Sequence, residues 1–262
     1  MSISRSIRRA RPALGTIVEL GVRIPEHSAE TANGGLDRAW RALAHVEAAL
    51  SAYDPCSDVG RFNSAPAGTS VKVGAHAAAV LRASADLARD SSGLFDVTQG
   101  SGPRAWAIRE TPAGVRVHKG SSTVRLDLGG IAKGYAVDRA FEVLAATLQV
   151  GEGEAACWVN AGGDLRVGGV ALSVFLRDEV RGGARPWLEL SDGALATSRY
   201  GPGARSRLWG APEAAARHVT VAAPRCMWSD ALSKVVALTG RADHPLLARH
   251  QAVAWLHGEA TC

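Results

Sequence analysis

Several features that mark particular protein classes are scarce or missing in this chain of 262 residues. No apolar run approaches the ~18 residues that a membrane-spanning helix needs, so we expect no integral membrane segment. Four cysteines are too few for a disulfide scaffold, and they form no CxxC pair and no metal-like spacing with histidine. Aromatic residues make up only 5%. What remains is a globular protein, because 47% hydrophobic residues are too many for a disordered chain.

An excess of acidic charge is also missing, since 30 lysines and arginines outnumber 25 aspartates and glutamates. Part of the basic excess is concentrated in Arg5, Arg8, Arg9 and Arg11. Such a cluster can contact nucleic acid or an acidic surface, but a solvated terminus explains it more simply. No zinc-finger spacing, RNA-binding aromatic motif or basic heptad accompanies it. We therefore expect residues 1–12 to be flexible and no nucleic acid to be bound.

An export signal is not apparent in the first 20 residues. Charges are present there, but no apolar core of about 7–15 residues follows them, and no lipid-attachment cysteine follows such a core. The sequence as written favours a cytoplasmic protein.

Hydrophobic periodicity indicates helices early in the chain and strands late in it. We predict helices over residues 33–50, 75–89, 131–148 and 227–239, with Asn33 capping the first. We predict strands over residues 13–24, 115–117, 123–128, 156–160, 164–167, 171–176, 188–190, 194–197, 218–222 and 252–256, the second and third being paired. Residues 51–66 are polar and rich in turn formers, which predicts a loop. This order indicates one α+β domain over residues 1–262, with a mixed or antiparallel sheet flanked by helices.

The strongest local signal is DLGGIAKGYAVD, residues 127–138. A strand ends there, two glycines turn the chain, and a helix begins. Such a turn lets backbone approach a ligand, and the helix start offers unpaired N–H groups to an anion. Lys133 adds a positive charge that suits a phosphate. A purely structural turn explains the same pattern, so the motif alone leaves both interpretations open.

Four further segments share this character, at residues 93–98, 158–164, 194–198 and 229–234. Each one alone is explained by a turn with a capping acid. Thr197 and Ser198, for example, suit either a phosphate contact or a strand end.

Taken together and in order, these motifs resemble the FAD:protein FMN transferase family, the flavin transferases of the thiamine-biosynthesis-lipoprotein type. The resemblance covers roughly residues 13–240. The matching segments are residues 14–16, 51–53 with 61–63, 93–98, 127–134, 160–164, 194–198 and 229–234.

The resemblance implies a T-fold-like architecture and a Mg²⁺-dependent reaction. Such proteins transfer FMN from FAD to a threonine of an acceptor flavoprotein through a phosphoester bond. Some members instead hydrolyse FAD to FMN and AMP.

By position, the resemblance also implies site residues. Those implied to bind FAD are Leu14, Tyr53, Leu94, Phe95, Asp96, Asp127, Lys133 and Leu208. Tyr53 and Phe95 suit stacking on a ring of FAD, although core packing explains Phe95 equally well. Asp230 and Lys133 are the implied catalytic residues. The implied metal position is formed by Gly130, Asp230, Ser233 and Lys234.

Two departures from the family pattern put the metal in question. Lys234 stands where the family has a metal-binding threonine, on the same helical face as Asp230. A protonated lysine has donors and no acceptor, so it does not ligate Mg²⁺, but its ammonium can pair with Asp230 and occupy the place of the cation. An active transferase would then either hold its metal through Asp230, Gly130 and phosphate oxygens, or replace the metal in part by Lys234. Ser233 supplies an oxygen only if the register shifts. In addition, residues 206–212 lack the family's His-Ile-x-Asp-Pro-x-Thr-Gly stretch.

Two alternatives to the transferase follow. One is an FAD-binding protein that has lost metal-dependent catalysis and serves as a carrier or partner. The other is an FAD pyrophosphatase.

Overall fold

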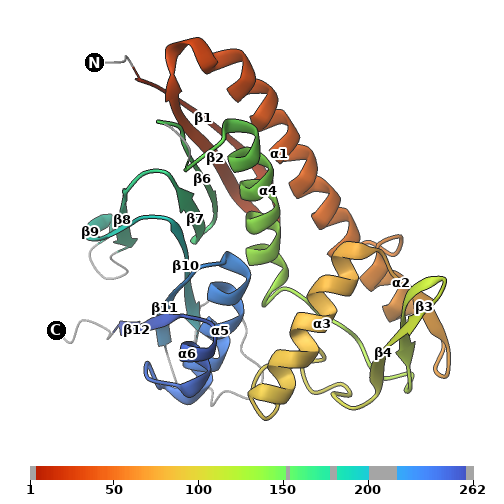
Figure 1. The fold of residues 1–262 in the computed structure, drawn as a ribbon. Coiled ribbons are helices and arrows are strands. Elements are labelled where there is room, and N and C mark those ends of the chain that lie inside the picture. The colour runs from red at the N-terminus through yellow and green to blue at the C-terminus, as the bar shows by residue number, and fades with distance from the viewer. Residues whose placement is uncertain (1–3, 152–153, 178–181, 201–216, 258–262) are drawn as a thin grey trace.

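Seven antiparallel strands form the main sheet of the computed structural model, which describes residues 4–151, 154–177, 182–200 and 217–257. Their order across the sheet is β1-β2-β6-β7-β10-β11-β12, and each neighbouring pair is antiparallel (Figure 1). Their bounds are β1 Ser4–Ala13, β2 Thr16–Pro25, β6 Ala156–Ala161, β7 Asp164–Gly168, β10 Gly193–Tyr200, β11 Arg217–Ala223 and β12 Val253–His257. The predicted α+β class is confirmed.

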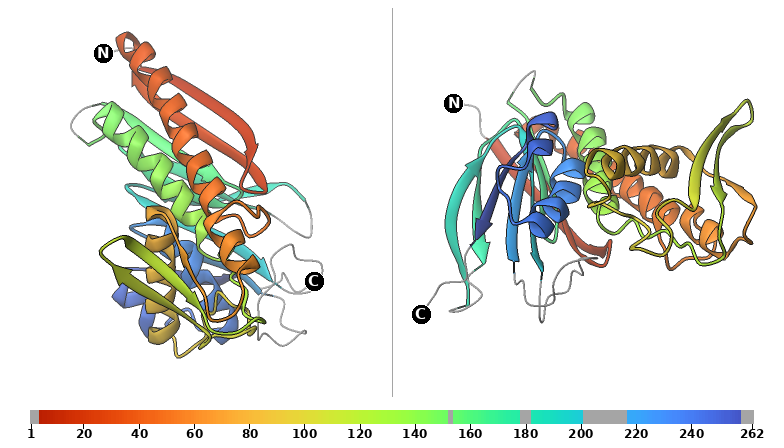
Figure 2. Two further views of the ribbon diagram at one scale, coloured as in Figure 1. Left: turned by 90° about the vertical axis from the view of Figure 1, so that its right-hand side faces the viewer. Right: turned by 90° about the horizontal axis from the view of Figure 1, so that it is seen from below.

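Three helices cover one face of this sheet (Figure 2). Helix α4 (Ala132–Leu148) packs on β6 and β7, α5 (Cys226–Thr239) packs on β10 and β11, and α1 (Ala29–Leu50) packs along α4. Each helix buries one apolar stripe, as an amphipathic helix on a sheet must. The short helices η1 (Glu26–Ser28) and α6 (Pro245–Arg249) precede α1 and β12 respectively. In the described part of the chain, no helix has both the length and the apolar character needed to cross a bilayer.

The other face of the sheet carries a hairpin of β8 (Leu172–Arg177) and β9 (Ala184–Leu190) (Figure 2). The ring of Trp187 on β9 meets the ring of Trp255 on β12 edge to face, with centroids 5.1 Å apart. This contact holds the hairpin against the last strand of the main sheet.

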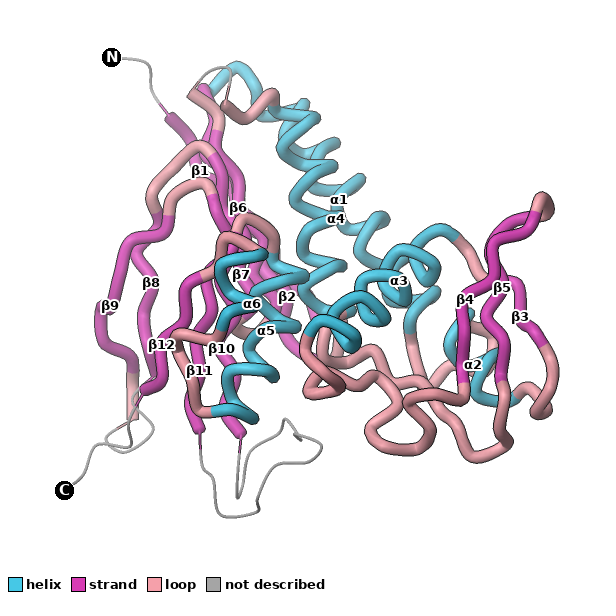
Figure 3. The backbone as a smooth tube through the Cα atoms, turned by 60° about the horizontal axis from the view of Figure 1, so that its bottom comes forward, coloured by secondary structure: helices cyan, strands magenta, loops and turns pink. Residues whose placement is uncertain are grey.

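A second group of elements lies beyond the C-terminal end of α1 (Figure 3). It contains α2 (Asp58–Ser64), α3 (Ala75–Asp90) and a small sheet of β3 (Ser70–Lys72), β5 (Gly114–Lys119) and β4 (Trp106–Thr111). Buried Lys119 donates to the carbonyl oxygen of Asn63 at 2.8 Å, where α2 ends. Burial lowers the pKa of Lys119. The lysine therefore ties the small sheet to the end of α2.

The structure corrects four sequence predictions. Residues 4–13 form β1 rather than a flexible terminus, because Arg9 bonds to α1 through Asp37 and all ten residues pair with β2. Helix α1 begins at Ala29, so Asn33 is no cap. The predicted loop over residues 51–66 contains α2, which begins where Ser57 accepts from the amide of Gly60 at 2.8 Å.

The fourth correction concerns the predicted pair of strands at residues 115–117 and 123–128. The first segment belongs to β5, but it pairs with β4 and β3. Residues 123–128 have no strand partner in the described structure; the side chain of Asn63 bonds there to both the amide and the carbonyl of Leu126, at 2.7 and 2.9 Å. A buried amide side chain thus takes the place of a neighbouring strand.

The pairing of β11 with β12 predicts a pH effect on stability. Burial, followed by the charges of His218 and Arg185, lowers the pKa of His257 to about 4, and its Nε2 lies 2.8 Å from Thr220 Oγ1. The unfolded chain therefore binds a proton below the ordinary histidine pKa of 6.5, while the folded chain does not until about pH 4. Folding stability is consequently lost as the pH falls through this window.

A His257→Gln variant is expected to lose less stability than the native chain between pH 7 and 5 in urea unfolding. The difference should stay well below ~1.4 kcal/mol per pH unit, the limit for one proton, because His257 is partly exposed. Exposed His27 provides the matched control as His27→Gln. Equal pH profiles for His257→Gln and the native chain would contradict the assignment.

Candidate functional site

The candidate site forms where the start of α4 meets α5. The amide of Gly134 donates to Asp230 Oδ2 at 3.1 Å. A Cβ atom on Gly134 would lie 2.4 Å from the carbonyl oxygen of Cys226 and 2.8 Å from Asp230 Cβ, closer than real Cβ contacts. Only glycine at this position lets the two helices approach so closely.

Lys234 turns back toward Asp230 one helical turn earlier. Its Nζ lies 2.9 Å from the carbonyl oxygen of Asp230 and forms an ion pair with Asp230 Oδ1. Burial opposes the charge of both groups, yet each charge stabilises the other: the net result is that the pKa of Lys234 is raised and that of Asp230 is lowered. Both groups are therefore ionised at neutral pH.

A second pair of charges joins α4 to β7. Lys133 Nζ lies 3.1 Å from Asp164 Oδ2. Burial and the neighbouring charge of Asp230 raise the pKa of Asp164 to about 7, although Lys133 acts to lower it. Burial acts to lower the pKa of Lys133, but Asp164 and Asp230 outweigh it and the pKa is raised. Asp164 Oδ1 has no hydrogen-bond partner in the described structure. A proton on Asp164 near neutral pH lessens the cost of burying that oxygen.

The glycine turns of the motifs close around the same region. A Cβ atom on Gly162 would lie 2.3 Å from Thr16 Oγ1, so the turn at residues 160–164 packs directly on the turn at residues 14–16. The amide of Thr197 donates to the carbonyl oxygen of Gly163 at 3.1 Å. A Cβ atom on Gly130 would lie 3.3 Å from Lys234 Cε and 3.6 Å from Phe95. Motif segments far apart in the sequence are thus in mutual contact.

The segment with Asp96 is joined to the segment with Asp127. The amide of Asp127 donates to the carbonyl oxygen of Val97 at 2.8 Å. Asp96 accepts from the amide and hydroxyl of Thr98, both at 2.8 Å, and Asp127 accepts from the amide of Gly129 at 2.8 Å. Both predicted FAD ligands therefore shape their own turns, and each carboxylate has further acceptor capacity.

A cavity of about 630 Å³ lies beside Phe95 and Asp96. Arg104 and Trp106 also line it. Phe95 itself is only 5% exposed, so most of its ring is packed in the core, while Leu94 next to it is partly exposed. This volume is typical of small-molecule sites.

The remaining predicted ligands differ in how they are placed. Tyr53, just after α1, is 96% exposed and presents a free ring. The amide of Leu14 donates to Glu47 of α1 at 2.8 Å, which fixes the 14–16 turn on that helix. Leu208 and the departing stretch at residues 206–212 lie outside the described residues.

Ser233 and the two hydroxyls of β10 are directed at protein groups. Ser233 Oγ donates to the carbonyl oxygen of Asp230 at 2.7 Å and lies 3.0 Å from the hydroxyl of buried Tyr200. Thr197 Oγ1 lies 2.9 Å from Thr220 Oγ1, and Ser198 Oγ lies 3.5 Å from Ser233 Oγ. These contacts favour the strand-end interpretation of Thr197 and Ser198.

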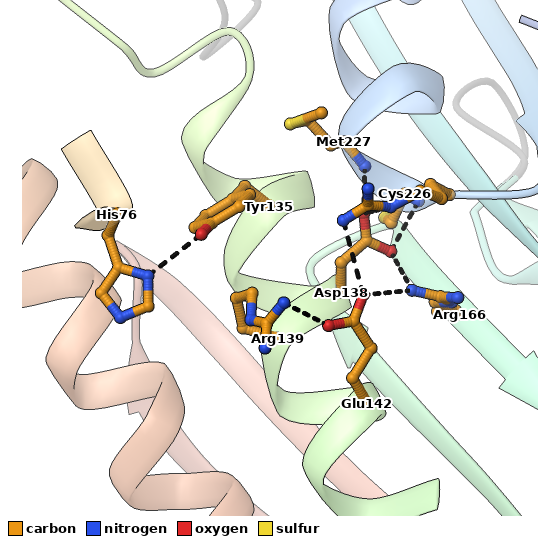
Figure 4. Close-up of polar contacts among 9 residues, drawn as sticks. His76, Tyr135, Asp138, Arg139, Glu142, Arg166, Cys226 and Met227 are labelled. Carbon is orange, nitrogen blue, oxygen red and sulfur yellow. Dashed lines mark hydrogen bonds and ion pairs between the residues drawn. The ribbon is translucent and has the colours of Figure 1, made fainter. Parts of the chain in front are cut away.

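A buried carboxylate on α4 fixes the start of α5 (Figure 4). Asp138 accepts from the amides of Cys226 and Met227 at 2.9 and 3.0 Å and pairs with Arg166 at 2.8 Å. Burial raises the pKa of Asp138 although Arg166 and these amides lower it. Asp138 therefore satisfies the free N–H groups of α5 from another helix, and Asp230 follows one turn later.

The site also includes Asp138, Tyr200 and the charge of Asp164, for which the sequence predicts no role. Asp138 ends the DLGGIAKGYAVD motif and Asp164 ends the double-glycine turn, so their positions within motifs were the available signals. Tyr200 carries no such signal, because its partner Ser233 is distant in the sequence.

The arrangement at the predicted metal position does not fit Mg²⁺. Magnesium is bound through oxygen ligands, chiefly carboxylates and phosphates. Both carboxylate oxygens of Asp230 are already engaged, one by the Lys234 ammonium and the other by the Gly134 amide, and its carbonyl accepts from Ser233 and Lys234. Elsewhere in the described chain, no three His, Cys, Asp or Glu side chains are grouped to hold a metal ion.

Comparison with known proteins gives one family and several structures. A model of the ApbE family matches residues 14–256. Flavin Transferase ApbE from Vibrio cholerae superposes with a TM-score of 0.76 at 19% identity, covering 97% of this chain and 94% of that chain. Pseudomonas stutzeri flavinyl transferase ApbE in its apo form gives 0.74 at 21%, covering 98% and 93%.

A third structure, the ApbE protein of Thermotoga maritima, gives a TM-score of 0.76 at 21% identity, covering 96% of this chain and 94% of that chain. No curated protein matches the sequence. At these identities the structures establish the fold, and with the family match they confirm the resemblance predicted from the motifs.

Proposed function

Because the chain belongs to the ApbE family, we propose that it transfers FMN from FAD to a threonine of an acceptor flavoprotein. The observation that carries the proposal is the meeting of the motif segments around the start of α4, where Lys133, Asp164, Asp230 and Lys234 form one cluster of charges. A diphosphate needs such a combination of cationic groups and closely approaching backbone.

The transfer is a phosphoryl substitution. Threonine Oγ forms a bond to the phosphorus of the FMN half, and the bond from that phosphorus to the bridging oxygen breaks. AMP leaves with that oxygen, and the threonine proton passes to AMP or to solvent. The protein contributes mainly by positioning FAD and stabilising negative charge, as is general for phosphoryl transfer.

Lys133 is the residue that we assign to the phosphates. Its side chain is 28% exposed, and the carboxylate of Asp164 holds its ammonium in place. Asp230, predicted as catalytic, acts in this proposal as a positioning residue, because its oxygens hold Gly134 and Lys234.

The rings of FAD have two suitable places. The exposed ring of Tyr53 offers a stacking surface, and the cavity beside Phe95 and Asp96 has room for a heterocycle. Leu94 and Asp127 adjoin the segment of Phe95 and Asp96, and Leu14 is held on α1 by Glu47; these three residues complete the proposed FAD contacts.

The test is direct flavinylation. The purified chain is incubated with FAD and a threonine-bearing acceptor domain, with and without Mg²⁺, and the acceptor is analysed by mass spectrometry. We expect the mass of one FMN on the acceptor, and none on an acceptor whose threonine is replaced by valine.

Other products identify the alternatives. FMN and AMP without acceptor labelling would establish an FAD pyrophosphatase. FAD binding with no turnover across several divalent metals would contradict both the transferase and the pyrophosphatase, and would leave a flavin carrier. This outcome is tested because Lys234 stands at the position of the family's metal-binding threonine.

A further inference from the structure

Lys234 occupies the position that the family pattern gives to a metal-binding threonine. Its ammonium lies against two oxygens of Asp230, as a bound metal ion would. Its side chain is only 16% exposed and runs inward past Gly130 rather than toward solvent. A Cβ atom on Gly130 would lie 3.3 Å from Lys234 Cε, so the absence of a side chain at Gly130 makes the room that the lysine uses.

We propose that the ammonium of Lys234 serves as a built-in cation for the diphosphate of FAD, so that this chain binds FAD without a divalent metal ion. The inference rests on the proposed function for its ligand. It concerns only Lys234 and its neighbours, and it explains why the oxygens of Asp230 are engaged by protein groups.

The number of N–H donors on the Lys234 ammonium supports a role in phosphate binding in addition to the ion pair with Asp230. An ammonium has three N–H donors. Two are used by Asp230, through its carbonyl oxygen at 2.9 Å and its Oδ1. The third has no acceptor among the described residues and remains for a phosphate oxygen. Lys133 lies nearby, because the amide of the next residue, Gly134, donates to Asp230 Oδ2 at 3.1 Å.

The residue type at position 234 also supports the proposed role as a cation. The chain has only four lysines, Lys72, Lys119, Lys133 and Lys234, and otherwise carries its positive charge on arginine. Two of the four belong to this one site. An ammonium is a compact point charge, which fits the space of a metal ion better than a planar guanidinium.

The experiment measures FAD binding by flavin fluorescence, in EDTA and in MgCl₂. For the native chain we expect a Kd that is the same in both within about twofold. For Lys234→Thr we expect affinity in EDTA to fall by at least ~10-fold, with recovery in MgCl₂. Lys234→Met, which keeps the length but not the charge, should lose affinity in both. Lys72→Thr, at an exposed lysine on β3, is the matched control and should bind as the native chain does.

A second readout uses no FAD. Binding of Mn²⁺, followed by electron paramagnetic resonance, should be absent in the native chain and appear in Lys234→Thr, because removal of the ammonium frees Asp230 Oδ1. Circular dichroism of each variant confirms that it is folded.

Three results would overturn the inference. FAD binding by the native chain that disappears in EDTA would overturn it while leaving the proposed function in place, and so would native-like affinity of Lys234→Thr in EDTA. Mn²⁺ bound by the native chain at this site would do the same. Failure of the native chain to bind FAD in either buffer would remove the proposed function, and this inference with it.

Discussion

Replacing Gly134 by alanine is expected to remove FAD binding and to lower the free energy of unfolding by about 1–3 kcal/mol, the usual cost of overpacking. The added methyl would lie 2.4 Å from the Cys226 carbonyl oxygen, and because that obstacle is backbone, α5 must move away from α4. The movement breaks the bond from the Gly134 amide to Asp230. Urea unfolding and flavin fluorescence measure the two effects.

Gly34→Ala provides the matched control, since Gly34 also lies inside a helix. A Cβ atom there meets only Arg38 Nη1, at 3.6 Å, which is ordinary contact. Alanine has the higher helix propensity, so this variant should gain about 0.5–1 kcal/mol and leave FAD binding unchanged. If both variants shifted stability in the same direction, the close approach of α4 and α5 would not be what requires glycine at position 134.

The second large effect is expected for Asp138→Ala, which should cost about 3–5 kcal/mol of unfolding free energy, as breaking a buried ion pair does. The substitution leaves Arg166 without its buried partner and the amides of Cys226 and Met227 without an acceptor. The start of α5 loosens, and Asp230 is displaced with it. We therefore expect FAD affinity to fall in the same variant, although Asp138 is not one of the proposed FAD-binding residues.

Glu142→Gln tests whether the large loss of stability expected for Asp138→Ala comes from the burial of Asp138. Glu142 faces Arg166 at 3.5 Å and Arg225 at 3.4 Å from the same helix, but its side chain is 32% exposed. Partly solvated ion pairs contribute about 0–1 kcal/mol, so this variant should unfold almost as the native chain does. Similar losses in Asp138→Ala and Glu142→Gln would show that the number of charges, and not capping of α5, determines stability here.

The elements that the sequence predicted well are those whose signal is local. Helix α3 was expected over residues 75–89 and extends from Ala75 to Asp90, because one apolar stripe faces the core along its whole length. Residues 123–128 misled the prediction for the opposite reason. Their composition suits a strand, but the backbone amide and carbonyl of Leu126 bond to the side chain of Asn63, about sixty residues earlier, and not to a neighbouring strand.

The same difference between local signals and long-range contacts applies to the candidate site. Motif order located Lys133, Asp230 and Lys234, and helical spacing correctly placed the last two on one face, where they form an ion pair. The pairing of Lys133 with Asp164 and the capping of α5 by Asp138 depend on how separate elements pack, which no local pattern specifies.

The arginines of β1 have a consequence for the behaviour of the protein in concentrated solution. Strand β1 is ten residues long and lies at one edge of the seven-stranded sheet, where none of the described strands pairs with its outer side. Long edge strands invite pairing between molecules, and charged side chains on them oppose it. A second copy of β1 paired there would bring Arg5, Arg8, Arg9 and Arg11 against four identical charges. The cluster that first suggested a nucleic-acid contact thus discourages the chains from joining sheet to sheet into aggregates.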